Sequence, residues 1–164
     1  MTVRAVSISE PLRLDCRLDE AVYSTVPAIS DFIQQNPRAG EPATEKTDVW
    51  ILFDDKNLYI SARCWDSQPE REIGNEMRRD GNNVIQNENL GIILDAFHDK
   101  RNGLLFNTNI LGARRDSAVT DESTSNGDWN AAWDARTSTF EAGWTIEVVI
   151  PFKSLRYRSG PNQV

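Results

Sequence analysis

The chain has 164 residues, 39% of them hydrophobic and 26% charged, which is ordinary for one globular domain and excludes disorder as the default. Its 18 Lys and Arg against 25 Asp and Glu give a net charge of −7, so nucleic acid is repelled on average and is not an expected partner. No run of about 18 apolar residues occurs, and a membrane-spanning helix is therefore not expected.

Helical signals are short. Asp19 is a suitable N-terminal cap for a helix over residues 20–25, and residues 151–155 fit a single helical turn. Elsewhere the spacing of apolar residues does not follow a helix.

The first pair of strands is predicted at residues 48–53 and 57–65. Both segments are rich in β-branched and aromatic residues, and Asp54-Asp55-Lys56 between them is good turn chemistry. Alternate residues of a strand point to opposite faces, so Arg63 and Trp65 share one face. We expect a β-hairpin with one core face and one face that is at least partly wet.

Two further pairs of strands follow: residues 90–97 with 103–111, and residues 132–139 with 143–151. Asn102-Gly103 is a strong hairpin signal for the first of these pairs. Short strands with turns at near-regular spacing favour an all-β antiparallel sandwich, of immunoglobulin-like or jelly-roll-like form, over a parallel sheet. The sequence therefore predicts a single β-sandwich domain over residues 1–164, with one or two short helical turns.

Two polar stretches interrupt the predicted strands, residues 66–89 and 116–131. Loops of this length on a rigid scaffold often carry binding residues, although they can also be surface excursions without function. Trp129 lies in the second stretch, where no apolar periodicity assigns it to a core. An exposed aromatic face flanked by amides, carboxylates and arginine suits a polyhydroxylated ligand. Trp133 and Trp144 lie in strands and are expected in the core.

Signals of catalysis and metal binding are few. His98 is the only histidine, and it sits in a polar turn without a Gly-x-Ser-x-Gly elbow or a reactive-cysteine context. Acidic pairs such as Asp121-Glu122 lie where turns need them, so a glycan-cleaving enzyme using these two is only an alternative. Calcium is the one cofactor considered, although no EF-hand-type loop is present. Cys16 and Cys64 lack the spacing of a zinc site and are expected as thiols without a disulfide.

Four ordered segments carry a family resemblance: Leu14–Tyr23, Asp54–Ile60, Leu94–Asp99 and Gly143–Phe152. Together they resemble family 9 carbohydrate-binding modules. Four further segments are similar to the subgroup in which this module precedes a domain thought to form an outer-membrane β-barrel: Arg79-Asp80, Asp99–Asn102, Asn109–Gly112 and Leu155–Tyr157.

The resemblance implies a DOMON-like β-sandwich in the periplasm or at the cell surface, associated with the outer membrane. It also implies a non-catalytic module that binds a carbohydrate in the service of carbohydrate catabolism, through the stretches 66–89 and 116–131. The candidate ligand-binding residues are Trp129, Arg79, Asp80, Asn109 and Trp65.

The chain departs from the family at several positions. Cys16 stands where the family has glycine, Tyr23 stands where it has tryptophan, and residues 82–89 hold no aromatic, so the family's sugar-clamping pair is not carried over. An interaction domain that docks onto a following β-barrel domain and binds no sugar is therefore the alternative function.

Pro161–Val164 ends the sequence where family members continue into another strand. We thus expect an N-terminal fragment of a larger exported protein, whose open edge allows edge-strand dimers.

Overall fold

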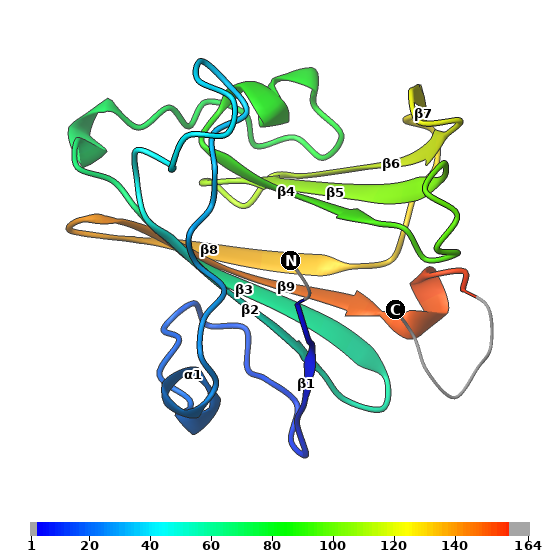
Figure 1. The fold of residues 1–164 in the computed structure, drawn as a ribbon, viewed down its shortest axis with the longest axis horizontal. Helices are drawn as coiled ribbons and strands as arrows, with labels where there is room; N and C mark the ends of the chain where they lie inside the picture. The colour runs from blue at the N-terminus through cyan, green and yellow to red at the C-terminus, as the bar shows by residue number, and fades with distance from the viewer. Residues whose placement is uncertain (1–2, 158–164) are drawn as a thin grey trace. The chain divides into compact units, whose positions relative to one another are not determined.

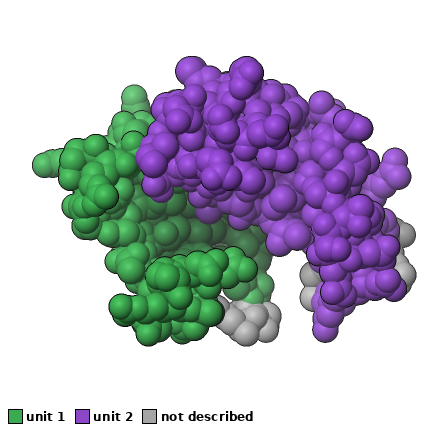
Figure 2. All heavy atoms as spheres, turned by 90° about the horizontal axis from the view of Figure 1, so that it is seen from above, with its two compact units in different colours: residues 1–72, 135–149 green, residues 73–134, 150–164 purple. Residues whose placement is uncertain are grey.

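The computed structural model describes residues 3–157 and divides the chain into two compact units. Unit 1 comprises residues 1–72 and 135–149, and unit 2 comprises residues 73–134 and 150–164 (Figure 2). Each unit therefore draws on two separate stretches of chain. A single domain over residues 1–164 stays a prediction, and the segment Pro161–Val164 lies outside the described residues.

Unit 1 is built on a five-stranded sheet in the order β1-β2-β3-β9-β8 (Figure 1). Its strands are β1 (Val6–Ser7), β2 (Thr47–Phe53), β3 (Asn57–Trp65), β8 (Asp134–Phe140) and β9 (Gly143–Pro151). The predicted hairpin of β2 and β3 is confirmed, with antiparallel pairing that places Trp50 opposite Ser61. The predicted pair at 132–139 and 143–151 is likewise confirmed as β8 and β9, while the short β1 adds to β2 in parallel.

Unit 2 contains a four-stranded sheet in the order β4-β5-β6-β7. Its strands are β4 (Asn89–Leu94), β5 (Gly103–Asn109), β6 (Arg114–Thr120) and β7 (Thr124–Asn126). The antiparallel pair β4 and β5 confirms the hairpin expected around Asn102-Gly103, with shorter strands than predicted. The prediction of a loop over 116–131 was wrong, because β6 occupies its start and pairs with β5 along six residues, and β7 then pairs with β6.

Helices are few and short in the described chain: α1 (Ala21–Thr25) and three 3-10 turns, η1 (Pro69–Arg71), η2 (Asn82–Gln86) and η3 (Phe152–Ser154). The helix predicted over 20–25 is confirmed, but its predicted cap is wrong. Glu20, not Asp19, takes the N-cap position, and it makes no side-chain capping hydrogen bond. No helix among the described residues has the length and apolar character needed to cross a bilayer.

One face of the sheet in unit 1 is covered in part by the N-terminal segment. Leu18 packs there with Trp50, Leu52 and Tyr59 in one buried cluster. Leu52 is fully buried, which stabilises the fold by about 1.5–3 kcal/mol. The face of β3 that was predicted to be partly exposed to solvent is thus buried over one half, around Tyr59. Further along β3 the N-terminal cover ends, and the side chains become partly exposed.

Candidate functional site

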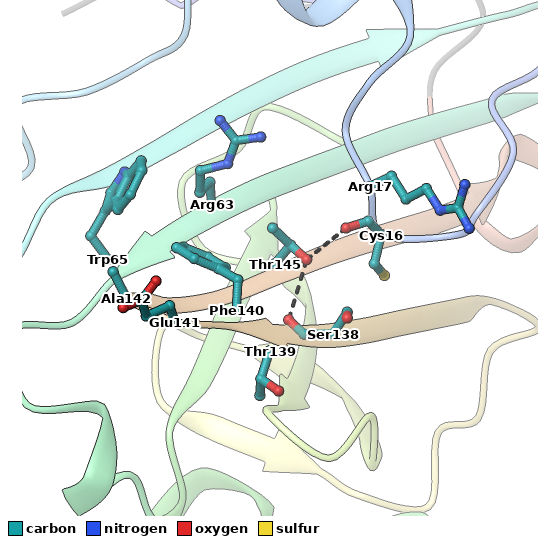
Figure 3. A pocket seen from close by; sticks show the side chains of 10 residues that line it. All are labelled: Cys16, Arg17, Arg63, Trp65, Ser138, Thr139, Phe140, Glu141, Ala142 and Thr145. Atoms are coloured by element: carbon teal, nitrogen blue, oxygen red, sulfur yellow. Dashed lines mark hydrogen bonds between the residues drawn. The ribbon is translucent and has the colours of Figure 1, made fainter.

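The uncovered part of this sheet face forms a hollow of about 520 Å³, which we call the Trp65 hollow. Its lining comes from the end of β3, from the β8–β9 hairpin and from the Cys16-Arg17 segment (Figure 3). The side chains with chemical character are those of Arg17, Arg63, Trp65, Ser138, Phe140 and Glu141. All of them belong to unit 1, so the hollow is complete within one compact unit.

Trp65 is the largest side chain of the hollow and is held at a fixed angle. Its ring lies 5.3 Å from that of Phe140 at an interplanar angle of 85°, the edge-to-face contact that aromatic pairs prefer. Its indole N–H points to Asp48 Oδ2 at 3.5 Å. The cationic groups of Lys46 and Arg63 lie 5.8 and 5.9 Å from its ring centroid. Both aromatic rings keep part of their surface exposed.

Arg63 has no carboxylate partner, although an acid lies opposite to it. The register of β2 and β3 pairs Asp48 with Arg63 across the strands. The Asp48 carboxylate instead accepts the Lys46 ammonium at 2.7 Å, and among residues 3–157 Arg63 forms no ion pair. The guanidinium of Arg63 therefore faces the hollow with its hydrogen-bonding donors unused by another charge.

The Cys16-Arg17 segment is tied to the sheet by two buried anchors. The Cys16 N–H donates to Glu147 Oε2 at 2.7 Å. Thr145 Oγ1 donates to the Cys16 carbonyl at 2.8 Å (Figure 3). Cys16 and Leu18 both adopt left-handed backbone conformations, with φ of 61° and 51°. Such conformations favour glycine, so a cysteine and a leucine adopt them here only because their surroundings enforce it. The strained turn projects Arg17 outward.

Glu147 is almost fully buried, with 2% of its surface exposed. Its other oxygen accepts the Tyr23 hydroxyl at 2.9 Å, and that hydroxyl also bonds Ser61 Oγ at 2.9 Å. Burial raises the pKa of the Glu147 carboxyl above its usual value, because the charged form loses its hydration. Burial, followed by the nearby Glu147 charge, raises the pKa of the Cys16 thiol to about 12. This thiol is therefore a poor nucleophile at neutral pH.

The predicted site residues Arg79 and Asp80 lie in unit 2, in a network centred on Asp116. Asp116 is fully buried, and its carboxylate accepts the Arg79 guanidinium at 2.5 Å and the Trp133 indole N–H at 2.9 Å. Its second oxygen accepts the Ala131 N–H at 2.7 Å. Arg79 also contacts Asp80 Oδ2 at 3.3 Å. The guanidinium of Arg79 is therefore largely occupied in stabilising unit 2.

Trp129 and Asn109 also lie in unit 2. Trp129 is half-buried, and its ring packs edge-on against Phe106 with centroids 5.8 Å apart. Asn109 is fully buried, and its amide group donates to the Glu76 carbonyl at 2.7 Å and to Asn87 Oδ1 at 2.9 Å. Since Asn109 reaches no surface, its role here is to hold the loop before β4 against β5. Trp133 and Trp144 are buried, as predicted.

The residues considered for catalysis and metal binding remain separate. His98 is exposed in its turn, and Asp121 pairs with Arg101 at 2.7 Å. Within residues 3–157 no group of three or more His, Cys, Asp or Glu side chains is placed to hold a metal ion. Calcium as a cofactor stays a prediction. Cys16 and Cys64 form no disulfide, as predicted.

Of the residues that line the hollow, the sequence analysis named Trp65 as a candidate ligand-binding residue and did not name Arg63, Phe140 or Arg17. Arg63 shares its strand face, and this alternation was the available signal. Phe140 lies 75 positions after Trp65, and Arg17 lies 48 positions before it. Neither had a local signal, because the sequence does not reveal that the β8–β9 hairpin and the Cys16-Arg17 turn meet at the end of β3.

These features define an all-β fold with two sheets, in which unit 1 carries an open hollow lined by aromatic rings and guanidinium groups. Two solved structures with a similar fold are a family 9 carbohydrate-binding module from Caldicellulosiruptor kristjanssonii in complex with glucose and in complex with cellotriose. The first has a TM-score of 0.62 at 18% identity, covering 90% of this chain and 68% of the other. The second has a TM-score of 0.61 at 17% identity, covering 90% and 66%.

A third similar structure is a putative carbohydrate-binding protein from Bacteroides uniformis, with a TM-score of 0.53 at 9% identity, covering 84% of this chain and 63% of the other. No protein-family model matches the chain, and no curated protein sequence matches it significantly. The chain thus spans about two thirds of the length of these structures. The predicted fold class, an all-β sandwich, is confirmed, and so is the resemblance to family 9 modules at the level of the fold.

Proposed function

We propose that the chain is a non-catalytic carbohydrate-binding module that binds a glycan in the Trp65 hollow. The observation that carries this proposal is the part-exposed Trp65 ring, held edge-on by Phe140 at the wall of an open hollow. Sugar rings present apolar C–H faces that pack on such aromatic surfaces, and their hydroxyls accept from guanidinium groups at the rim. The similar fold of modules solved with glucose and with cellotriose supports the same function.

Of the five residues predicted from sequence, this proposal keeps Trp65 as the main contact. Arg79 and Asp80 are engaged with one another and with the Asp116 network, and Asn109 is buried. Export to the cell surface and a following barrel domain stay predictions from the family resemblance.

The proposal is tested by isothermal titration of the chain with glucose, cellotriose and a panel of other neutral and acidic oligosaccharides. We expect micromolar to millimolar binding to at least one of them, weakened about tenfold or more by Trp65→Ala, as for a central aromatic contact. Phe97→Ala is the matched control, because Phe97 is an exposed aromatic of unit 2. Failure of every oligosaccharide to bind, or equal binding by Trp65→Ala, would overturn the proposal.

A further inference from the structure

We infer that the glycan bound in the Trp65 hollow is anionic, and that its carboxylate or sulfate group is recognised by Arg63, while Arg17 adds positive charge at the edge of the hollow. This inference rests on the proposed function and specifies the class of ligand. It goes beyond the similar structures, whose ligands are the neutral sugars glucose and cellotriose.

The charge of the hollow is opposite to that of the chain. The chain carries a net charge of −7, yet two guanidinium groups line the hollow against one carboxylate, that of Glu141. Glu141 is exposed at the tip of the β8–β9 hairpin, where water screens its charge. A local excess of positive charge in an acidic protein attracts anionic ligands to that one place.

The two arginines are available because their neighbouring acids are already paired. Asp48 lies opposite Arg63 but binds Lys46 at 2.7 Å. Asp15, two residues before Arg17, binds Arg13 at 2.7 Å. In the described chain neither Arg17 nor Arg63 forms an ion pair of its own. A ligand anion therefore has no internal carboxylate to displace.

The position of Arg63 suits a sugar acid in particular. Its guanidinium carbon lies over the Trp65 ring, 5.9 Å from the ring centroid. A sugar that packs against the exposed part of this ring therefore lies next to the guanidinium. Figure 3 shows Arg63 between Trp65 and the Cys16-Arg17 segment. The planar fork of a guanidinium matches two oxygens of a carboxylate or sulfate at once, which gives a stronger bond than a neutral hydroxyl.

Arg17 is presented by a turn that other contacts hold in place. The left-handed residues Cys16 and Leu18 flank it, and both are buried. The anchors from Cys16 to Glu147 and Thr145 fix this turn on the sheet. Strained backbone persists only where its surroundings enforce it, and here it holds Arg17 in an exposed position at the edge of the hollow.

The test compares each acid with its own neutral form. Trigalacturonate and its methyl ester probe the carboxylate, and a sulfated galactose oligomer and its desulfated form probe the sulfate. Binding to the whole chain is measured by isothermal titration at low and high salt. Arg63→Gln and Arg63→Lys are compared with Arg38→Gln, which removes an exposed arginine of the same unit.

We expect one acid to bind about tenfold or more tightly than its neutral form, with a preference that falls as salt rises. Arg63→Gln should abolish this preference, Arg63→Lys should keep part of it, and Arg38→Gln should keep all of it. Equal binding of acid and neutral forms, both lost in Trp65→Ala, would overturn this inference and leave the proposed function standing. A preference that survives Arg63→Gln would also overturn it, and no binding by any glycan would overturn both.

Discussion

The buried carboxylate of Glu147 should make the stability of the fold depend on pH. Burial raises the pKa of this carboxyl above 4.5, its ordinary value, so the folded state holds the proton to a higher pH than the unfolded state does. The stabilisation from this group is fully present below pH 4.5. It is then lost as pH rises through the pKa of the folded state, at a slope of up to about 1.4 kcal/mol per pH unit.

Glu147→Gln tests this expectation while keeping the hydrogen bonds. The new amide oxygen can accept the Cys16 N–H, and the amide N–H can donate to the Tyr23 hydroxyl, which then donates to Ser61. We expect the variant to be as stable as the wild-type chain near pH 4 and progressively more stable than it toward pH 7. Urea-unfolding free energies at pH 4, 5, 6 and 7 give the comparison, with Glu141→Gln as the control at an exposed position. Parallel curves for Glu147→Gln and the wild type would refute the reasoning.

Glu147→Leu separates the charge from the hydrogen bonds. The leucine fills a similar volume but accepts nothing, so the Cys16 N–H loses its partner while the Tyr23 hydroxyl can still turn to Ser61. One orphaned buried donor costs about 1–3 kcal/mol. We expect Glu147→Leu to be less stable than Glu147→Gln by this amount at every pH. Equal stability of the two variants would show that the bond to Cys16 does not matter.

Three further outcomes are expected. Asp116→Ala leaves two buried donors and one arginine without their acceptor, so the free energy of unfolding in urea should fall by about 2–5 kcal/mol, and a loss below about 1 kcal/mol would contradict the network described above. Gly143→Ala places a methyl group closer to the Cys64 carbonyl than van der Waals contact allows, whereas in Gly40→Ala, also at a positive φ, the methyl group meets no atom within 4 Å. Thermal melts should show Gly143→Ala to be at least several degrees less stable than Gly40→Ala. Equal melting temperatures would contradict the close approach. Because burial raises the pKa of Cys16 to about 12, iodoacetamide at pH 8 should leave this residue unmodified in the native chain and label it in urea, as peptide mass spectrometry would reveal.

The sequence was sufficient for those strands whose buried face is apolar. In β9 the residues Trp144, Ile146, Val148 and Ile150 alternate with partly polar ones, and the strand was predicted within its observed bounds. The hairpins that flank turns such as Asn102-Gly103 were found for the same reason. The alternation of apolar residues and the turn residues determine these strands and hairpins, and both can be seen in a short stretch of sequence.

β6 was missed because its buried face is charged. Phe106 of β5 lies opposite Asp116, which occupies a position that a hydrophobic pattern would give to an apolar residue. The carboxylate is tolerated there only because Arg79, 37 residues earlier, and Trp133, 17 residues later, satisfy it. No window along the sequence contains that information, and the same stretch therefore looked like a polar loop.

The candidate site depends on the same kind of distant contact, which explains why only one of its residues was found. Trp65 stands out in the sequence by its type, but it becomes part of a hollow only because the N-terminal cover ends before Arg63 and the β8–β9 hairpin brings Phe140 beside it. The bond from Cys16 to Glu147 joins residues 131 positions apart and fixes where that cover ends. A buried acid far along the chain thus sets the position of Arg17, and the ligand-binding character of this sheet face is a property of its cover as much as of its strands.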